Sequence, residues 1–335
     1  MAEIVLGIGT SHGPMLSTPP DQWGQRVAAD KKNPQHWFKG NPCTFDELVA
    51  LRANENLQDQ ITQKMWNERH AACRAAIAKL AGVFAEAKPD IAVIVGNDQM
   101  EMFVNGTIPA MSVYWGDTIP NDFPDADEMA ALPPGIPISV PGHIPPEGAT
   151  YEGLPKLGRH LIDHAIEDSF DMAAVTTLPE NGRRHIPHAF GFVYRQIMND
   201  KPVPSVPVIL NTFYPPNQPT VGRCYDLGKS LVRAIKSWDD RLRVALIASG
   251  GLSHFVIDEA VDNAVLDALR KRSIRDVAAL GEPIFQAGTS ECKNWVPVAG
   301  AMADLGYPPT VVDYVPCYRS VAGTGNAMGF VYWRK

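Results

Sequence analysis

Two short apolar segments of the chain each lead into a histidine, and this feature limits the folds that the chain can adopt. The run Arg243-Val-Ala-Leu-Ile-Ala248 has the length of a buried strand, and small residues then lead to His254. The chain begins in the same way, because the apolar run Ile4-Val-Leu-Gly-Ile-Gly9 leads through Thr-Ser to His12. Both segments therefore predict a strand with an imidazole at its carboxyl end.

Two further apolar runs have polar residues at the same end. Residues 91–95 are followed by Gly96-Asn-Asp-Gln99, and residues 206–210 are followed by Asn211-Thr212. In open α/β sheets, ligands bind at the edge formed by the carboxyl ends of the strands. The sequence therefore predicts a ligand site at this edge.

The remaining pattern predicts an α/β protein with three α/β/α layers, a mixed central sheet and long insertions. No repeat or low-complexity linker divides residues 1–335, so we expect a single domain, with a possible lid over residues 21–56 and a Pro/Gly-rich insertion over residues 104–150. Helices are predicted at 57–87, 155–168, 222–238, 258–280 and 294–305, with another starting near 187, and further strands at 171–178, 310–316 and 326–333.

Composition excludes several classes of protein. The formal net charge of −7 is spread along 335 residues without a basic tract, which argues against nucleic acid as a partner. The five cysteines form no CxxC pair, which favours reduced thiols. No apolar run approaches the roughly 18 residues of a membrane span, and no signal peptide is recognisable at the N-terminus. We therefore expect a cytoplasmic protein without a membrane partner.

Three local motifs suggest other chemistry. Gly9-Thr-Ser-His-Gly13 fits the nucleophile elbow of serine hydrolases, with Ser11 as the nucleophile, but the prolines that follow disfavour the helix that an elbow requires. His160 and His164 have the spacing of a zinc site on a helix, although a solvated helix face explains them better.

The third motif, His185-Ile-Pro-His188, lies at a predicted helix start, where His188 is suited to exchanging a proton. The neighbouring Arg183 and Arg184 are candidate partners for a carboxylate, because guanidinium groups match carboxylates. The histidines at the two strand ends, His12 and His254, favour metal ligation or base catalysis.

Four segments in order resemble the class III extradiol ring-cleavage dioxygenases, the relatives of the protocatechuate-cleaving LigB subunit. They are the Thr10-Ser-His-Gly-Pro14 exit, Pro89 to Asp98, the Ser249 to His254 exit, and Glu291 before Trp295-Val-Pro-Val-Ala-Gly-Ala301. The resemblance covers nearly the whole chain, although residues 21–56 have no clear counterpart in the pattern.

The resemblance implies one Fe(II) ion bound by two histidines and a glutamate. By position, His12 is the first ligand, Glu291 is the carboxylate, His254 transfers protons and His188 is an additional active-site histidine. Gln99 stands where the family normally has its second ligand histidine. Either the amide oxygen of Gln99 or a nitrogen of His70 from the preceding helix would complete the set.

The implied function is the Fe(II)-dependent opening of a catecholic aromatic acid by O2, with a substrate of the gallate, methylgallate or lignin-derived biaryl type and with both oxygen atoms incorporated. Two alternatives stay open at this point: a serine or zinc hydrolase on an α/β scaffold, and a metal-free protein that binds aromatic acids. We expect a homodimer, which is a common assembly for soluble enzymes.

Overall fold

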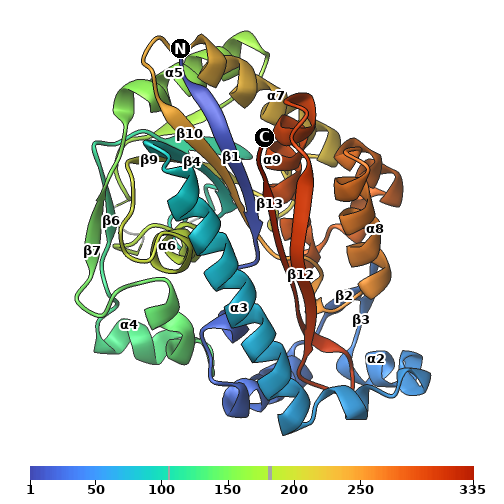
Figure 1. Ribbon diagram of the computed structural model, residues 1–335. Coiled ribbons are helices and arrows are strands. Elements are labelled where there is room, and N and C mark those ends of the chain that lie inside the picture. The colour runs from blue at the N-terminus through green and yellow to red at the C-terminus, as the bar shows by residue number, and fades with distance from the viewer. Residues whose placement is uncertain (105, 180–182) are drawn as a thin grey trace.

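The computed structural model describes residues 1–104, 106–179 and 183–335, and a mixed sheet forms its centre (Figure 1). Within these residues the sheet has nine strands in the order β11-β13-β1-β10-β4-β9-β5-β8, with β12 paired to β13 outside this order. The strands are β1 (Glu3–Thr10), β4 (Ile91–Asn97), β5 (Met111–Tyr114), β8 (Ala173–Val175), β9 (Ser205–Leu210), β10 (Arg243–Ser249), β11 (His254–Val256), β12 (Pro309–Tyr318) and β13 (Thr324–Trp333).

The four strands β1, β10, β4 and β9 run parallel at the middle of the sheet. They are nearly continuous apolar runs because helices cover both of their faces. Thr10 pairs with Ser249, and Asn97 pairs with Leu210, so the strands end at a common edge. The prediction that polar residues gather there is confirmed for these four strands.

Helices pack on both faces of the sheet. The long helix α3 crosses one face against β1, β12 and β13, and α9 packs on β1 and β4 from the other face beside α7 (Figure 1). Side chains alternate accordingly, since Val93 and Val95 belong to one core and Ala92 and Ile94 to the other. The predicted three-layer α/β/α class is confirmed. The helices are α1 (Val27–Lys32), α2 (Phe45–Leu51), α3 (Gln63–Ala87), α4 (Ala126–Ala131), α5 (Pro155–Glu167), α6 (His188–Phe192), α7 (Val221–Ser237), α8 (Glu259–Arg270) and α9 (Cys292–Asp304).

Three predicted bounds were wrong. The helix predicted over 258–280 ends at Arg270, because Arg272 adopts a positive φ of 57° before a separate 3-10 turn. The helix predicted from residue 57 begins at Gln63, where the Thr62 side chain accepts a hydrogen bond from the Met65 amide. The strand predicted over 171–178 covers three residues, as β8.

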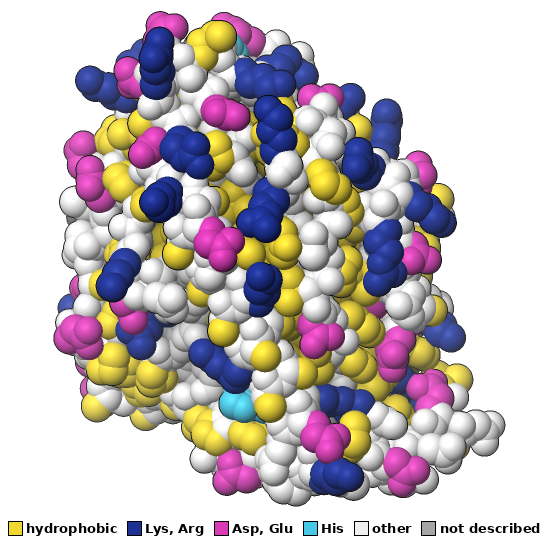
Figure 2. Space-filling view, in the orientation of Figure 1, with side chains coloured by type: hydrophobic (Ala, Val, Ile, Leu, Met, Phe, Trp, Pro, Cys, Tyr) yellow, Lys and Arg dark blue, Asp and Glu magenta, His cyan; other side chains and the backbone are white. Residues whose placement is uncertain are grey.

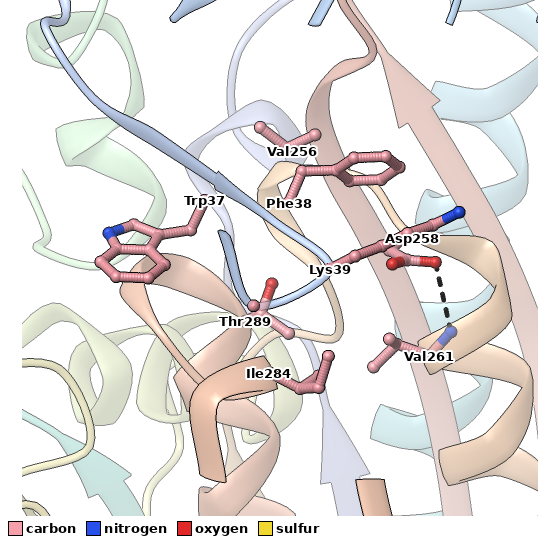
Figure 3. Close-up of a pocket in the computed structure, with 9 residues that line it drawn as sticks. Trp37, Phe38, Lys39, Val256, Asp258, Val261, Ile284 and Thr289 are labelled. Carbon is pink, nitrogen blue, oxygen red and sulfur yellow. Dashed lines mark hydrogen bonds between the residues drawn. The ribbon is translucent and has the colours of Figure 1, made fainter. Parts of the chain in front are cut away.

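The two insertions contain different helices and strands. Residues 21–56 hold most of the 3-10 helix η2 (Pro20–Arg26), α1, α2 and the hairpin of β2 (His36–Phe38) and β3 (Asn41–Cys43). Figure 3 shows Phe38 of this hairpin beside Val256 of β11, with the Trp37 side chain directed to the other side. Residues 104–150 hold β5, β6 (Thr118–Asn121), α4 and the first part of β7 (Ala149–Glu152).

Acidic and basic side chains are interspersed over the face seen in Figure 2, without a large field of one sign. Among the described residues, no helix combines the length and the apolar character needed to cross a membrane.

Candidate metal centre and adjoining cavity

Four segments bring His12, Gln99, His254 and Glu291 together at the carboxyl edge of the sheet. His12 follows β1, Gln99 follows β4, His254 begins β11, and Glu291 ends the 3-10 helix η9 (Ala287–Glu291). His12 Nε2 lies 3.1 Å from Glu291 Oε2, and His254 Nε2 lies 3.5 Å from the same oxygen. The structure therefore brings His12, His254 and Glu291 together, although they are distant along the chain.

The proton on His12 can be assigned from its neighbours. Ser249 Oγ donates its hydrogen to the Ala189 carbonyl at 2.6 Å, so this oxygen accepts at 2.9 Å from Nδ1–H of His12. His12 Nε2 then carries a lone pair, and it is buried with no hydrogen-bond donor among the residues that the structure describes. Burial lowers the pKa of His12, with His188 and His254 acting in the same direction and Glu291 opposing them. This imidazole is therefore held neutral, which is the form that binds metal ions.

Replacing Ser249 with alanine is expected to weaken metal binding about 10- to 100-fold, because outer-shell partners fix the tautomer and orientation of a ligand histidine. Metal affinity is measured by calorimetric titration of the chelator-treated protein. Ser139→Ala is the matched control, since Ser139 also lines the cavity but donates to the Ile136 carbonyl. Equal affinities for both variants would contradict the role of Ser249.

His254 differs from His12 in its protonation. Its Nδ1 lies 2.7 Å from the Leu252 carbonyl and therefore donates a proton to it. Burial alone would lower the pKa of His254, but the Glu291 carboxylate and the Leu252 carbonyl raise it above its ordinary value. His254 is thus the better proton carrier of the two histidines that face Glu291.

Glu291 is held as a carboxylate by several donors. Its Oε1 accepts from Gln99 Nε2 at 2.7 Å and Asn97 Nδ2 at 3.2 Å, and its Oε2 accepts from the Gly251 amide at 2.9 Å. Burial opposes the charge, but His254 and His12 keep the pKa of Glu291 well below its usual value.

The donor set fits a divalent metal in its chemistry. The imidazole of His12, the carboxylate of Glu291 and the amide of Gln99 offer one nitrogen and two oxygen donors of the kinds that bind divalent first-row metals. Ligands about 2.1 Å from one ion and at right angles to each other lie about 3 Å apart, close to the 3.1 Å between His12 Nε2 and Glu291 Oε2. Across the described residues, no group of three or more His, Cys, Asp and Glu side chains is already arranged around a metal position. A bound ion would therefore require small side-chain adjustments.

A cavity of about 310 Å³ opens beside this group. Residues 104–150 supply much of its wall through Pro124, Leu132, Pro133, Ile136, Ser139, Val140, His143 and Ile144. From residues 21–56, Arg26 lines the cavity. Trp37 lines a neighbouring hollow with Phe213 and Phe255.

A second polar group lies on the cavity wall around His188. Its ring centroid is 4.7 Å from that of His12, and its Nδ1 lies 2.7 Å from Glu101 Oε2. Burial alone would lower the pKa of His188, but the attraction of Glu101 raises it to about 9. Burial, aided by the His188 cation, lowers the pKa of His143 to about 3. The wall therefore carries one imidazolium and one neutral imidazole at neutral pH.

The Glu101–His188 pair predicts a pH-dependent stability. Because the folded pKa of His188 is raised to about 9, the pair stabilises the fold most between pH 5 and 6.5, and this contribution is lost as the pH rises through about 9. Glu101→Gln is expected to cost about 3 kcal/mol at pH 6 and much less at pH 10. Urea unfolding with chelator present measures the difference, and a constant cost across this range would contradict the assignment.

The other predicted residues are placed differently. His70, the alternative second ligand, lies outside this group: its ring centroid is 6.3 Å from that of Trp23, and it lines a separate hollow with Leu16. Arg183 lines the cavity, whereas Arg184 is exposed and does not.

The residues of the hydrolase alternatives have structural partners. Ser11 is fully buried, and its Oγ accepts from the Gly329 amide, so it is not presented to a substrate. His160 Nε2 and His164 Nε2 both contact Ser237 Oγ on the neighbouring helix α7. Neither arrangement supports a serine or zinc hydrolase.

Sequence reasoning missed Arg26, Glu101 and Ser249. Ser249 has a signal in the sequence, because it is the last residue of a strand whose exit delivers His254. Arg26 ends the 3-10 helix η2 and Glu101 lies in an irregular segment, and in neither place does periodicity indicate the direction of the side chain.

The chain is similar to several known proteins. The sequence model of a family described as the catalytic LigB subunit of aromatic ring-opening dioxygenase matches residues 60–327. A gallate dioxygenase of Pseudomonas putida is 34% identical over 122 residues, which cover 36% of this chain and 33% of that protein. The chain thus aligns with about a third of that relative. An uncharacterized protein from Escherichia coli K12 has a crystal structure with a TM-score of 0.45 at 13% identity, covering 98% of this chain and 99% of that one. Because the family match includes His188, His254 and Glu291 and spans well over half of the sequence, the chain belongs to the LigB family.

Proposed function

We propose that this protein is an Fe(II)-dependent extradiol dioxygenase that opens the ring of a catecholic aromatic acid with O2. The observation that carries the proposal is the convergence of a neutral imidazole and a carboxylate beside a cavity. His12 Nε2 and Glu291 Oε2 face each other at 3.1 Å with no hydrogen bond between them. A divalent cation satisfies both lone pairs at once. Family membership supplies the reaction class.

We assign the metal to His12 and Glu291, with Gln99 as the third ligand. Gln99 turns its amide nitrogen toward Glu291, and rotation of the amide would present its oxygen instead. When bound, Fe(II) supplies the Lewis acidity that favours ionised diols and the redox chemistry that engages O2.

The surrounding residues handle protons and charge. His254, with its raised pKa, accepts a phenolic proton of the substrate and returns one to the product. The His188 cation, fixed by Glu101, stabilises negative charge on the bound diolate. The wall of residues 124–144 excludes water from the ring.

Iron binding and proton transfer are assigned to different residues, so the two roles can be tested separately. Chelator-treated protein is reloaded anaerobically with Fe(II), and O2 uptake is followed with catechol, protocatechuate and gallate. We expect uptake only with iron and a diol. His254→Gln should keep bound iron but lose turnover, whereas Gln99→Ala should lose iron.

Other outcomes favour other functions. Loss of iron in His254→Gln would make His254 a ligand. Binding of aromatic acids without iron uptake would favour the metal-free alternative, since Gln99 replaces a ligand that the family normally has. We also propose a cytoplasmic homodimer with a role in the catabolism of lignin-derived aromatics and with residues 1–335 acting as one catalytic domain. Sedimentation of the full chain measures the dimer.

A further inference from the structure

Arg26 is a half-buried cation on the wall of the cavity. Its Nε and Nη1 atoms are buried and make no hydrogen bond within the described residues. Burial, aided by the nearby Arg319, lowers the pKa of Arg26 to about 10, so the group stays charged at neutral pH. Buried polar atoms are ordinarily hydrogen-bonded, which makes these two guanidinium nitrogens exceptional.

Asp30 attracts Arg26 but is already paired with another arginine. Both oxygens of Asp30 are engaged by Arg319 at 2.7 Å, and Thr324 Oγ1 donates to Asp30 Oδ2 at 2.7 Å. Asp30 thus serves one arginine in a bidentate pair, which is the strong geometry for such groups. The cluster of Arg26, Arg319 and Asp30 carries two positive charges and one negative charge, which leaves a local excess of one positive charge.

The structure holds the Arg26 side chain against the apolar wall. A Cβ at Gly135 would lie 2.9 Å from Cγ of Arg26, so the absence of a side chain there makes room for the arginine stem. Gly135 has a φ of 81°, and its neighbours Pro133 and Ile136 line the cavity. The guanidinium therefore adjoins the surface on which an aromatic ring would pack.

We propose that Arg26 binds the carboxylate of the aromatic substrate and selects acids over uncharged diols. This inference rests on the proposed function for the identity of the ring. Arg26 lies outside residues 60–327, the part of the chain that the family model matches. Sequence reasoning pointed instead to Arg183 and Arg184, of which Arg184 is exposed and lies away from the cavity.

Binding of unreactive ligands tests the inference without requiring turnover. Calorimetric titration with benzoate and with benzamide compares a carboxylate with its neutral analogue. Arg26→Met, which keeps the apolar stem, should bind benzoate about 10- to 100-fold more weakly than wild type, and benzamide equally well. Arg26→Lys should recover part of the benzoate affinity. Arg184→Gln is the control and should leave both affinities unchanged.

Steady-state kinetics give a second readout on the iron-loaded protein. With protocatechuate, Arg26→Met should raise KM about 10- to 100-fold, with kcat changed much less, because the carboxylate is bound in both the ground and transition states. With catechol, which lacks the carboxylate, neither constant should change. Arg183→Gln tests the rival residue in the same assays.

The outcomes separate this inference from the proposed function. Equal benzoate affinity in Arg26→Met and wild type, with both folded by thermal unfolding, overturns the inference, as does a loss confined to Arg183→Gln. Loss of benzoate binding in Arg26→Met without ring opening of any diol supports the anion site and refutes the dioxygenase. If Arg26→Met does not fold, Arg26→Gln replaces it, and an unchanged benzoate affinity in that variant overturns the inference.

Discussion

Replacing Glu291 with glutamine is expected to remove bound metal from the protein and to abolish O2 uptake on a diol. Glu291 supplies the negative charge that faces His12 and His254, and the neutral amide is a much weaker ligand. Loss of outer-shell partners alone costs 10- to 100-fold in metal affinity, so loss of this ligand should cost at least about 100-fold. Metal content after dialysis and calorimetric titration measure the effect.

The matched control is Glu101→Gln, which removes a buried carboxylate from the same cavity. Glu101 pairs with His188 and not with His12 or His254, so this variant should keep its metal. Retention of a full equivalent of iron by Glu291→Gln would show that the ligand set has been placed wrongly. Loss of iron from both variants would show that the cavity responds to total charge, not to a specific ligand.

Truncating Trp295 to alanine is expected to lower the free energy of unfolding by about 3–5 kcal/mol, the usual cost of removing a large buried aromatic side chain. Trp295 is fully buried in α9, and its ring packs against Gly9 and Gly329. Its Nε1 donates to the Gly250 carbonyl at 3.0 Å, which fixes the exit of β10. Denaturant unfolding of the chelator-treated protein measures the loss.

Trp295→Phe separates packing from hydrogen bonding. It keeps most of the ring volume but leaves the Gly250 carbonyl without this donor, so we expect a smaller cost of about 1–3 kcal/mol. If the phenylalanine variant were as unstable as the alanine variant, the hydrogen bond would outweigh the packing. If neither variant were destabilised, Trp295 would not be part of the core.

The strand ends of this protein are predictable from sequence because burial on two faces imposes long apolar runs. That rule predicts β1, β4, β9 and β10 from the sequence, and it predicts His12 and His254 at one edge of the sheet. Glu291 has no such signal, since it ends a 3-10 turn that leads directly into α9 and does not follow a strand. Its placement came from resemblance to a family.

Other features depend on tertiary contacts that a single sequence does not reveal. His70 has helical spacing toward the sheet edge, but its ring packs near Trp23 and it lines a separate hollow with Leu16. Among the described residues, Arg26 is left without a carboxylate partner because Asp30 is already bound to Arg319, which is 289 residues away from Asp30. Local pattern carries no information about such competition for a partner.

The position of β1 in the sheet has a consequence for how the protein is made. Both neighbours of β1, namely β10 and β13, are synthesised late, after residue 242. On the ribosome, this apolar strand therefore remains without its native partners while most of the chain emerges, which exposes it to aggregation. The nascent polypeptide needs shielding over this interval, and a general chaperone that captures extended apolar peptides would meet that need.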